Sequence, residues 1–186
     1  MAQDEAVHLP RLGTLLALPA ADHPELLAPS VVAALASWHH GDRVAVAEID
    51  PDLADTAAFS EAYAVPLGAS ANCVLVAGRR DGQERIAACL VRADTRADVN
   101  GLVKRLLDVR KASFLPMERA VEESGMEHGG INPVGLPPTW RLLVDSRVTA
   151  IETVLVGSGV RRSKLLLPGS TVASLPGAEI VEGLAG

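Results

Sequence analysis

Residues 72–93 read NCVLVAGRRDGQERIAACLVRA and carry the clearest structural signal in the chain. Two apolar runs flank an Asp-Gly pair, and such a pair between apolar runs strongly indicates a β-hairpin. We therefore expect two antiparallel strands joined by a tight turn at Asp81 and Gly82. Each run contains one cysteine, Cys73 or Cys89. Buried free thiols are the favoured state in a reducing compartment, and a disulfide between the two strands is the alternative.

Helical and strand patterns follow one another irregularly along the rest of the chain. Helices are predicted over residues 29–42, 55–65, 97–107 and 116–125. Strands are predicted over residues 43–50, 111–115, 140–145, 152–159, 163–168 and 177–185. Strands and helices do not alternate as they do in regular βαβ units. The pattern is typical of an α+β fold with a mixed, mostly antiparallel sheet that curls.

The length of 186 residues fits one globular domain with a substantial core. Residues 1–28 are interrupted by prolines and show weak periodicity, so we expect an N-terminal extension packed loosely on a domain of residues 29–186. The longest apolar runs are shorter than the roughly 20 residues that a membrane span needs. The N-terminal residues are acidic rather than basic, which argues against a secretory signal. We therefore expect a cytoplasmic protein.

The net charge of −6 disfavours a general nucleic-acid binder, because such proteins gain affinity from many phosphate contacts. Aromatic residues make up only 3% of the chain, which leaves few platforms for stacked bases. Local basic clusters nevertheless occur at residues 79–80, 104–111 and 161–164. They are either solvated ends of strands and helices or contacts for a few phosphates. The composition therefore allows a small nucleic-acid footprint and argues against an extended one.

A glycine-proline segment, GGINPVGLPP at residues 129–138, precedes the predicted strand at 140–145. Glycine amides that no side chain shields can converge on one anionic or carbonyl oxygen, and Pro133 and Pro137 would hold that backbone in place. The segment is therefore a candidate oxyanion hole, and the alternative is a stiff connection between a helix and a strand. The sequence contains no GxSxG, HExxH, CxxC or P-loop motif. We accordingly expect no metal and no cofactor.

Two further candidates follow this segment. Asp145 ends the predicted strand at 140–145, and Gly157, Ser158 and Gly159 end the next strand. If the two strands pair as neighbours, their ends meet at one mouth, where Asp145 could bind a ribose hydroxyl or an amino group. The alternative for an aspartate at the end of a strand is that it forms a turn.

Several of these stretches, taken in order, resemble the YbaK/EbsC family, which includes the editing domain inserted in bacterial prolyl-tRNA synthetases. The stretches are NCVLVAG, DVNGLVKRLL, KASF, EESGMEHGGINPVGLP, LLVDSRV and ETVLVGSGVRRSKLLL. The resemblance covers most of the chain from about residue 30 onward, and the GxxxP element from Gly129 to Pro133 is its most specific part. The resemblance implies an α+β fold whose mixed sheet curls into a partial barrel flanked by helices.

The resemblance also implies an activity, the trans-editing hydrolysis of the ester that joins a wrong, small amino acid to the terminal ribose of a tRNA. The implied partner is the aminoacylated tRNA 3′ end, and an aminoacyl-tRNA synthetase is a further possible partner. We expect binding neither to a membrane nor to DNA. Family members use no metal and no protein nucleophile. The main-chain amides of Gly129 and Gly130 would bind the substrate carbonyl, and Asp145 matches the family's acidic residue. The other pocket residues that it implies are Ile131, Asn132, Pro133, Gly157, Ser158 and Gly159.

One position departs from the family pattern. Deacylases of the family carry a lysine that contacts the acceptor end, whereas this chain has Asn72 there. Asparagine donates hydrogen bonds but brings no positive charge to a phosphate or a leaving group. The first hypothesis is a deacylase in which Asn72 takes the catalytic place, and the second is a non-catalytic module that binds an acyl-nucleotide or a tRNA end. Hydrolysis of another small ester or amide, unrelated to tRNA, is the third.

Overall fold

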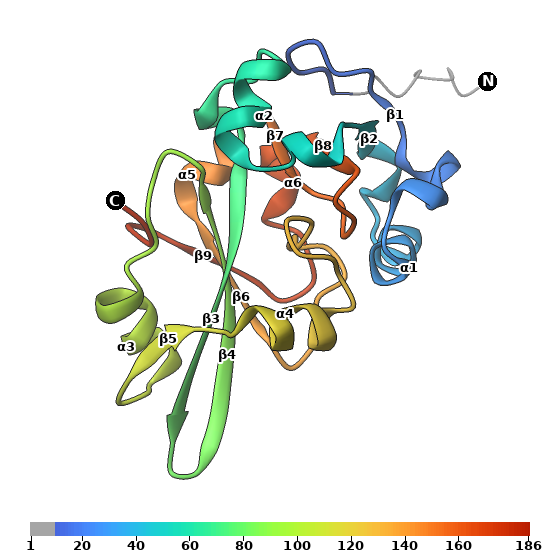
Figure 1. The fold of residues 1–186 in the computed structure, drawn as a ribbon. Helices are drawn as coiled ribbons and strands as arrows, with labels where there is room; N and C mark the ends of the chain where they lie inside the picture. Colours follow the sequence, from blue (N-terminus) through green and yellow to red (C-terminus); the bar gives the residue numbers. More distant parts are fainter. Residues whose placement is uncertain (1–9) are drawn as a thin grey trace, which may run out of the picture.

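Two β-sheets form the framework of the protein in the computed structural model, which describes residues 10–186 (Figure 1). The four-stranded sheet has the order β1-β2-β8-β7, with bounds Leu18–Pro19, Ala45–Glu48, Ser163–Pro168 and Thr153–Gly157. The five-stranded sheet has the order β5-β3-β4-β6-β9, with bounds Ala112–Phe114, Ala71–Arg80, Gln83–Arg92, Arg141–Asp145 and Ala178–Val181. Neighbouring strands are antiparallel, except that β6 runs parallel to both β4 and β9. The predicted α+β class with a mostly antiparallel sheet is confirmed.

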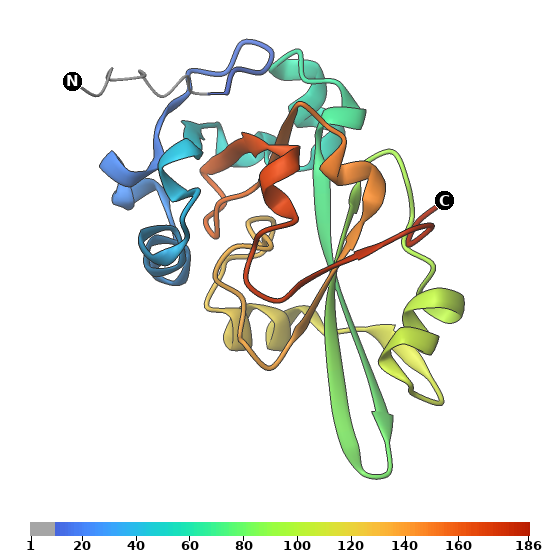
Figure 2. The same ribbon diagram turned by 180° about the vertical axis from the view of Figure 1, so that it is seen from behind.

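β3 and β4 form the predicted hairpin, which projects beyond the rest of the five-stranded sheet (Figures 1 and 2). The two strands have ten residues each and pair over their full length. The turn residues Asp81 and Gly82 have φ values of 51° and 80°. A type I′ turn requires positive φ at both central positions, and its twist matches that of the two strands. The expected tight turn at these two residues is confirmed.

The hairpin places its two cysteines on opposite faces. Cys73 pairs with Leu90, and Cys89 pairs with Val74. Because directly paired residues of an antiparallel ladder share a face, the two thiols point away from each other and cannot form a disulfide. Both cysteines are free, which confirms the favoured expectation. Burial raises the pKa of Cys89 to about 12, so this thiol stays protonated at neutral pH.

The two sheets curl toward each other without closing into a barrel. An isolated parallel bridge between Ser70 and Leu155 joins the start of β3 to β7. The largest apolar cluster lies between the sheets and includes Leu90 from the five-stranded sheet and Leu165 from the four-stranded sheet. The partial barrel that the resemblance implied is therefore an open one.

Within residues 10–186, six short α-helices flank the sheets. They are α1 Pro29–Ser37, α2 Thr56–Ala62, α3 Lys104–Leu107, α4 Met117–Ser124, α5 Ser146–Thr149 and α6 Gly169–Val172. α2 packs Phe59 against the outer face of the four-stranded sheet, and α3 packs Leu107 against the outer face of the five-stranded sheet. Four residues are too few to show a helical period, so α5 and α6 were not predicted. Among residues 10–186, no helix combines the length and the apolar character that crossing a bilayer requires.

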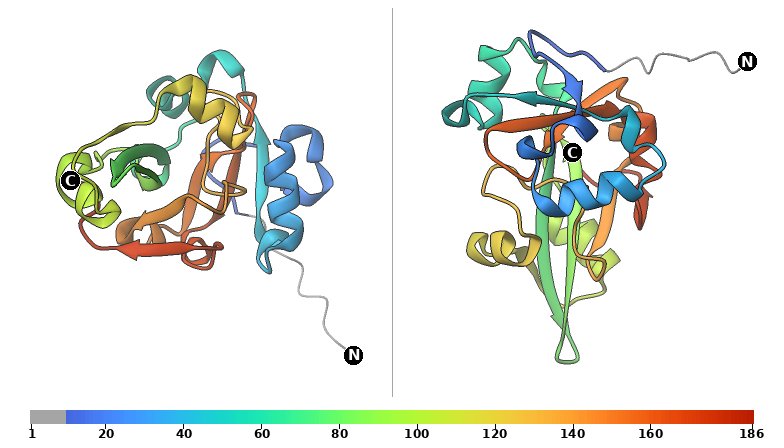
Figure 3. Two further views of the ribbon diagram at one scale, coloured as in Figure 1. Left: turned by 90° about the horizontal axis from the view of Figure 1, so that it is seen from below. Right: turned by 90° about the vertical axis from the view of Figure 1, so that its right-hand side faces the viewer.

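α1 lies beside β2 and is shorter than the predicted helix over 29–42 (Figure 3). It ends at Ser37, and its buried side chains join the core between the sheets. The N-cap position of this helix belongs to Ala28, and the first turn begins with Pro29. Proline suits that place because it has no amide hydrogen to leave unsatisfied.

Residues 18–28 pack closely on the core, which corrects the expectation of a loosely packed extension. β1 pairs with β2, and Ala20 and Leu26 are 1% and 6% exposed. The segment packs closely because its apolar side chains cover the edge of the sheet and α1. Residues 1–9 of the expected extension lie outside the described residues.

Candidate functional site

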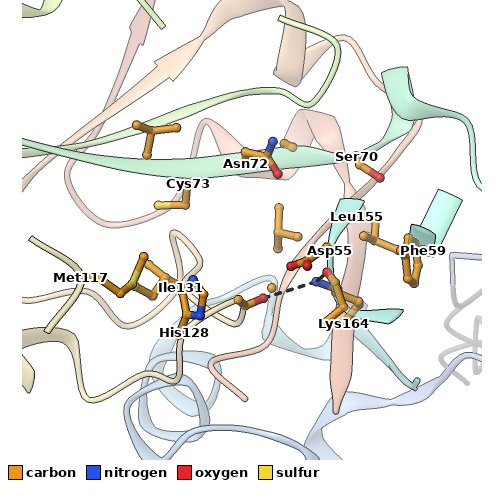
Figure 4. A pocket seen from close by; sticks show the side chains of 16 residues that line it. Asp55, Phe59, Ser70, Asn72, Cys73, Met117, His128, Ile131, Leu155 and Lys164 are labelled. Atoms are coloured by element: carbon orange, nitrogen blue, oxygen red, sulfur yellow. Dashed lines mark hydrogen bonds between the residues drawn. The ribbon is translucent and has the colours of Figure 1, made fainter. Parts of the chain in front are cut away.

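A cavity of about 390 Å³ lies between β3 and β7, next to the bridge that joins them (Figure 4). Residues 70–74 at the start of β3 form one wall, and residues 155–157 of β7 form the other. The remaining lining comes from Ala54, Asp55, Phe59, Met117, His128, Gly129, Ile131 and Lys164. A volume of this size falls in the range of small-molecule sites.

Gly129 contributes its backbone to the cavity wall. Its φ is 83°, in the left-handed region that glycine adopts without strain. Its carbonyl accepts a hydrogen bond of 3.4 Å from the ammonium of Lys164. Gly130 does not line the cavity, and its amide donates to the carbonyl of Glu127 at 2.9 Å. The structure therefore brings Gly129 to the cavity and uses the Gly130 amide inside the loop.

The amides of Gly129 and Ile131 remain as donors in the loop that closes the cavity. Both residues line the cavity, and neither amide has a hydrogen-bond acceptor among residues 10–186. Two backbone amides fixed in one loop are suited to stabilising negative charge on a substrate oxygen. The candidate donors to a substrate oxygen are therefore the amides of Gly129 and Ile131, a pair that differs from the expected Gly129 and Gly130.

The loop at residues 128–131 packs backbone against backbone on the loop that follows β7. The Gly159 amide donates to the Gly130 carbonyl at 2.8 Å, and the Glu127 amide donates to the Gly159 carbonyl at 2.9 Å. A Cβ atom on Gly157 would lie 2.3 Å from the Gly130 carbonyl oxygen. Gly157 lines the cavity and allows the two loops to approach this closely.

Two polar side chains of these loops hold them in shape. Asn132 is fully buried, and its side-chain oxygen accepts a hydrogen bond of 2.7 Å from the Val134 amide. Ser158 is also fully buried, and its hydroxyl lies 2.7 Å from the hydroxyl of Ser163. Neither Asn132 nor Ser158 lines the cavity. Their polar groups stabilise the loops from within.

Pro133 and Gly159 also lie outside the cavity lining. Pro133 lines a separate apolar cavity beside Trp38 and Trp140. A Cβ atom on Gly159 would lie 2.3 Å from the Cβ atom of Ala28, so this glycine permits close packing on the N-terminal segment. The loop residues that the structure does bring together at the cavity are Gly129, Ile131 and Gly157.

Asp145 lies away from the cavity, at the end of β6. β6 and β7 belong to different sheets, so they do not pair and their ends do not meet at one mouth. The carboxylate is 1% exposed, accepts hydrogen bonds from the amides of Arg147 and Ala185 at 2.9 and 3.0 Å, and pairs with the Arg147 guanidinium. Burial acts to raise the pKa of Asp145, but these hydrogen bonds outweigh it and lower the pKa. Asp145 thus caps α5, which agrees with the alternative that this aspartate forms a turn.

Replacement of Asp145 with alanine is expected to lower the free energy of unfolding by about 3 kcal/mol, because two buried amides lose their acceptor and Arg147 loses its partner. Asp145→Asn keeps an acceptor oxygen and should cost about half as much. Because folding lowers the pKa of Asp145, the carboxylate stabilises the fold at pH values above its unfolded-state pKa of about 3.9. This stabilisation disappears as the pH falls through the folded-state pKa. Urea unfolding at about pH 7 and about pH 2 tests this. Equal differences between wild type and Asp145→Ala at both pH values would contradict the prediction.

Asn72 and Cys73 lie on the β3 wall of the cavity (Figure 4). Asn72 is exposed and pairs with Val91 of β4, so the structure places it at the rim. Burial, with a smaller effect from Cys89, raises the pKa of the Cys73 thiol. This thiol therefore stays protonated at neutral pH and is unsuited to act as a nucleophile.

Most residues that line the cavity have no counterpart among the predicted site residues. They include Asp55, Phe59, Met117, His128 and Lys164. Lys164 carried the clearest signal, because it stands in the apolar strand SKLLLP and lysine is almost never fully buried unless it is paired. Within residues 10–186, no three His, Cys, Asp or Glu side chains gather in an arrangement that could hold a metal ion.

Comparison with known proteins gives a family match and a set of similar folds. The model of the aminoacyl-tRNA editing domain matches residues 50–174. A solved structure described as a "putative trans-editing enzyme for prolyl tRNA synthetase" has a TM-score of 0.70 and 21% identity, over 83% of this chain and 94% of the other. A structure of the hypothetical protein APE2540 has a TM-score of 0.66 and 20% identity, over 76% and 90%. No curated protein matches the chain.

The two solved structures show a shared fold, and the family match reaches further. It covers 125 of the 186 residues. Every residue that lines the cavity lies inside the matched segment, as do both glycine loops. The chain therefore belongs to the aminoacyl-tRNA editing domain family.

Proposed function

We propose that the chain is an aminoacyl-tRNA deacylase that acts in trans. It hydrolyses the ester between a wrong, small amino acid and the terminal ribose of a tRNA. The observation that carries the proposal is the placement of the cavity, because its entire lining lies within the editing-domain segment. The backbone amides available in the loop supply the chemistry that ester hydrolysis requires.

In this proposal the carbonyl oxygen of the aminoacyl ester lies at the amides of Gly129 and Ile131. When water adds to the carbonyl carbon, that oxygen gains negative charge. Amides that are already fixed in place stabilise the charge without reorganising during the reaction. Gly157, on the facing wall, carries no side chain and so lets this loop stay close to that wall.

Side chains around the cavity limit the size of the amino acid. Cys73, Met117, Ile131 and Leu155 line the space with thiol, thioether and branched aliphatic groups. An apolar pocket distinguishes amino acids that differ by a methylene by only about 1–3 kcal/mol. We therefore propose a preference for one small amino acid over its close relatives rather than absolute selection.

The proposed partner is the aminoacylated 3′ end of a tRNA, and an aminoacyl-tRNA synthetase is a further proposed partner. A net charge of −6 fits contact with the tRNA end better than contact with a long stretch of its backbone. With such a partner, the proposed location of the protein is the cytoplasm. Neither a membrane nor DNA enters this proposal.

Release of labelled amino acid from tRNAs charged with Ala, Ser, Cys, Thr or Pro tests the proposed function. We expect rapid loss of one species in the presence of the protein and slow loss of the others. Inertness toward every species, with the protein shown to be folded, would favour the non-catalytic binding module, and binding of the same charged tRNAs would then be measured. Activity that does not depend on an intact CCA end would indicate hydrolysis of another small ester.

A further inference from the structure

Lys164 reaches the cavity from β8, a strand that lies between β2 and β7 (Figure 4). It pairs with Ala47 on one side and with Gly157 on the other. Its side chain projects from the face of the sheet that α2 covers, and the residue is only 8% exposed. A lysine so far from water needs either a partner or a function to compensate for lost hydration.

The contacts of Lys164 satisfy only part of its ammonium group. Nζ donates to the carbonyls of Ala54 and Gly129 at 3.1 and 3.4 Å and lies 5.8 Å from the centre of the Phe59 ring. Among residues 10–186, no carboxylate lies within ion-pair distance of this amine. An ammonium has three N–H donors, and the two carbonyls occupy two of them. The third is left for a ligand in the cavity.

The charged groups near Lys164 do not neutralise the positive charge of its ammonium. Burial is the main cause that lowers the pKa of Lys164 to about 8, Arg161 adds to the lowering, and Asp55 opposes it. The other titratable groups that line the cavity are His128 and Cys73. At neutral pH the amine is therefore mostly protonated. A buried positive charge without an ion-pair partner is well placed to stabilise negative charge that develops on a bound substrate.

We propose that Lys164 is a catalytic residue of the deacylation, whose ammonium donates a hydrogen bond to the ribose oxygen that leaves when the ester breaks. This inference rests on the proposed function. The oxygen of a water molecule bonds to the carbonyl carbon, and the bond from that carbon to the ribose oxygen breaks. One proton of the water ends on the ribose oxygen and the other goes to solvent, so the amino acid leaves as its carboxylate. Lys164 keeps its own proton and acts through its charge.

The variant Lys164→Met tests the inference because it keeps an unbranched side chain and removes the amine. We expect kcat on the tRNA species that is cleaved to fall about 100-fold with little change in KM, because the interaction is made in the transition state. The melting temperature should be equal or higher, since an apolar side chain of similar size often replaces a buried charge without loss. Arg43→Met, which removes an exposed positive charge outside the cavity and outside the basic clusters, should stay within about twofold of wild type.

A second measurement is the pH dependence of the wild-type rate, which does not require the variant to fold. After subtraction of uncatalysed hydrolysis, the rate of the wild-type protein should decline above about pH 8, as Lys164 loses its proton and its charge. The residual activity of Lys164→Met should lack this decline. The deacylation substrate in both measurements is the charged tRNA that the wild-type protein cleaves.

The outcomes separate this inference from the proposed function. A folded Lys164→Met protein with wild-type turnover overturns the inference and leaves the deacylase intact. A wild-type rate that continues to rise above about pH 8 also overturns it, even if the variant does not fold. Inertness of the wild-type protein toward every charged tRNA contradicts the proposed function first and removes the inference with it.

Discussion

Replacing Gly129 with alanine is expected to reduce deacylation about 100-fold while the protein remains folded. Gly129 has a φ of 83°, and a Cβ atom there would lie 2.7 Å from Nη1 of Arg161. The end of the arginine side chain can move aside, so the main effect comes from the backbone. An L residue in the left-handed region costs roughly 1–2 kcal/mol. We expect the loop to relax and to carry the Gly129 amide away from the substrate oxygen, which initial rates on the cleaved tRNA would measure.

Gly177→Ala is the matched control for this change. Gly177 has a φ of 74°, an added Cβ atom would have no neighbour within 4 Å, and the residue does not line the cavity at Gly129. The substitution therefore imposes similar backbone strain at a distance from the proposed chemistry. Both variants should lose similar stability, and only Gly129→Ala should lose activity. Wild-type rates in both would show that the loop is a structural connection alone.

Gly157→Ala is expected to lower the free energy of unfolding by about 2–3 kcal/mol. The new Cβ atom would lie 2.3 Å from the carbonyl oxygen and 2.7 Å from the carbonyl carbon of Gly130. Both atoms belong to the backbone, so no side-chain rotation can relieve the overlap. The two loops must separate, and the hydrogen bond between Gly159 and Gly130 is expected to break. Urea denaturation gives the loss of stability.

Gly68→Ala provides the comparison for Gly157→Ala. A Cβ atom on Gly68 would lie 3.1 Å from Nη2 of Arg92, at the flexible end of a side chain. Since that end can shift, we expect a change of less than about 1 kcal/mol. If Gly157→Ala unfolds at the same urea concentration as Gly68→Ala, the close approach of the two loops is not important for stability.

Much of the fold could be predicted because local residues specify it. Asp81 and Gly82 set the hairpin turn, and the strands that they join pair in the register that a two-residue turn imposes. Pro116 and Gly125 mark the two ends of α4, and Gly125 has the expected left-handed φ of 67°. Each of these signals acts within a few positions of the element that it defines. Such elements need no knowledge of the tertiary structure.

The cavity could be predicted only in part, because contacts between distant segments build it. The sequence indicated Gly129 and Gly157 through their glycine-rich surroundings. It did not show that β6 and β7 lie in different sheets, which takes Asp145 away from the cavity. Lys164 reaches the cavity only because β8 pairs with β7 and faces the loop after α4. These placements depend on strand pairing across the chain, which no local pattern encodes.

The backbone contact between the glycine loops divides the cavity wall into a part that can vary and a part that cannot. Around Gly129 and Gly157 the wall is main chain, so a side chain at Gly157 would force the loops apart and one at Gly129 would strain the backbone. Elsewhere the wall consists of side chains such as Phe59, Met117 and Leu155, which mutation can enlarge or trim. A descendant of this protein that edits a different amino acid would therefore change its specificity at those side chains. The proposed oxyanion site would be inherited unaltered.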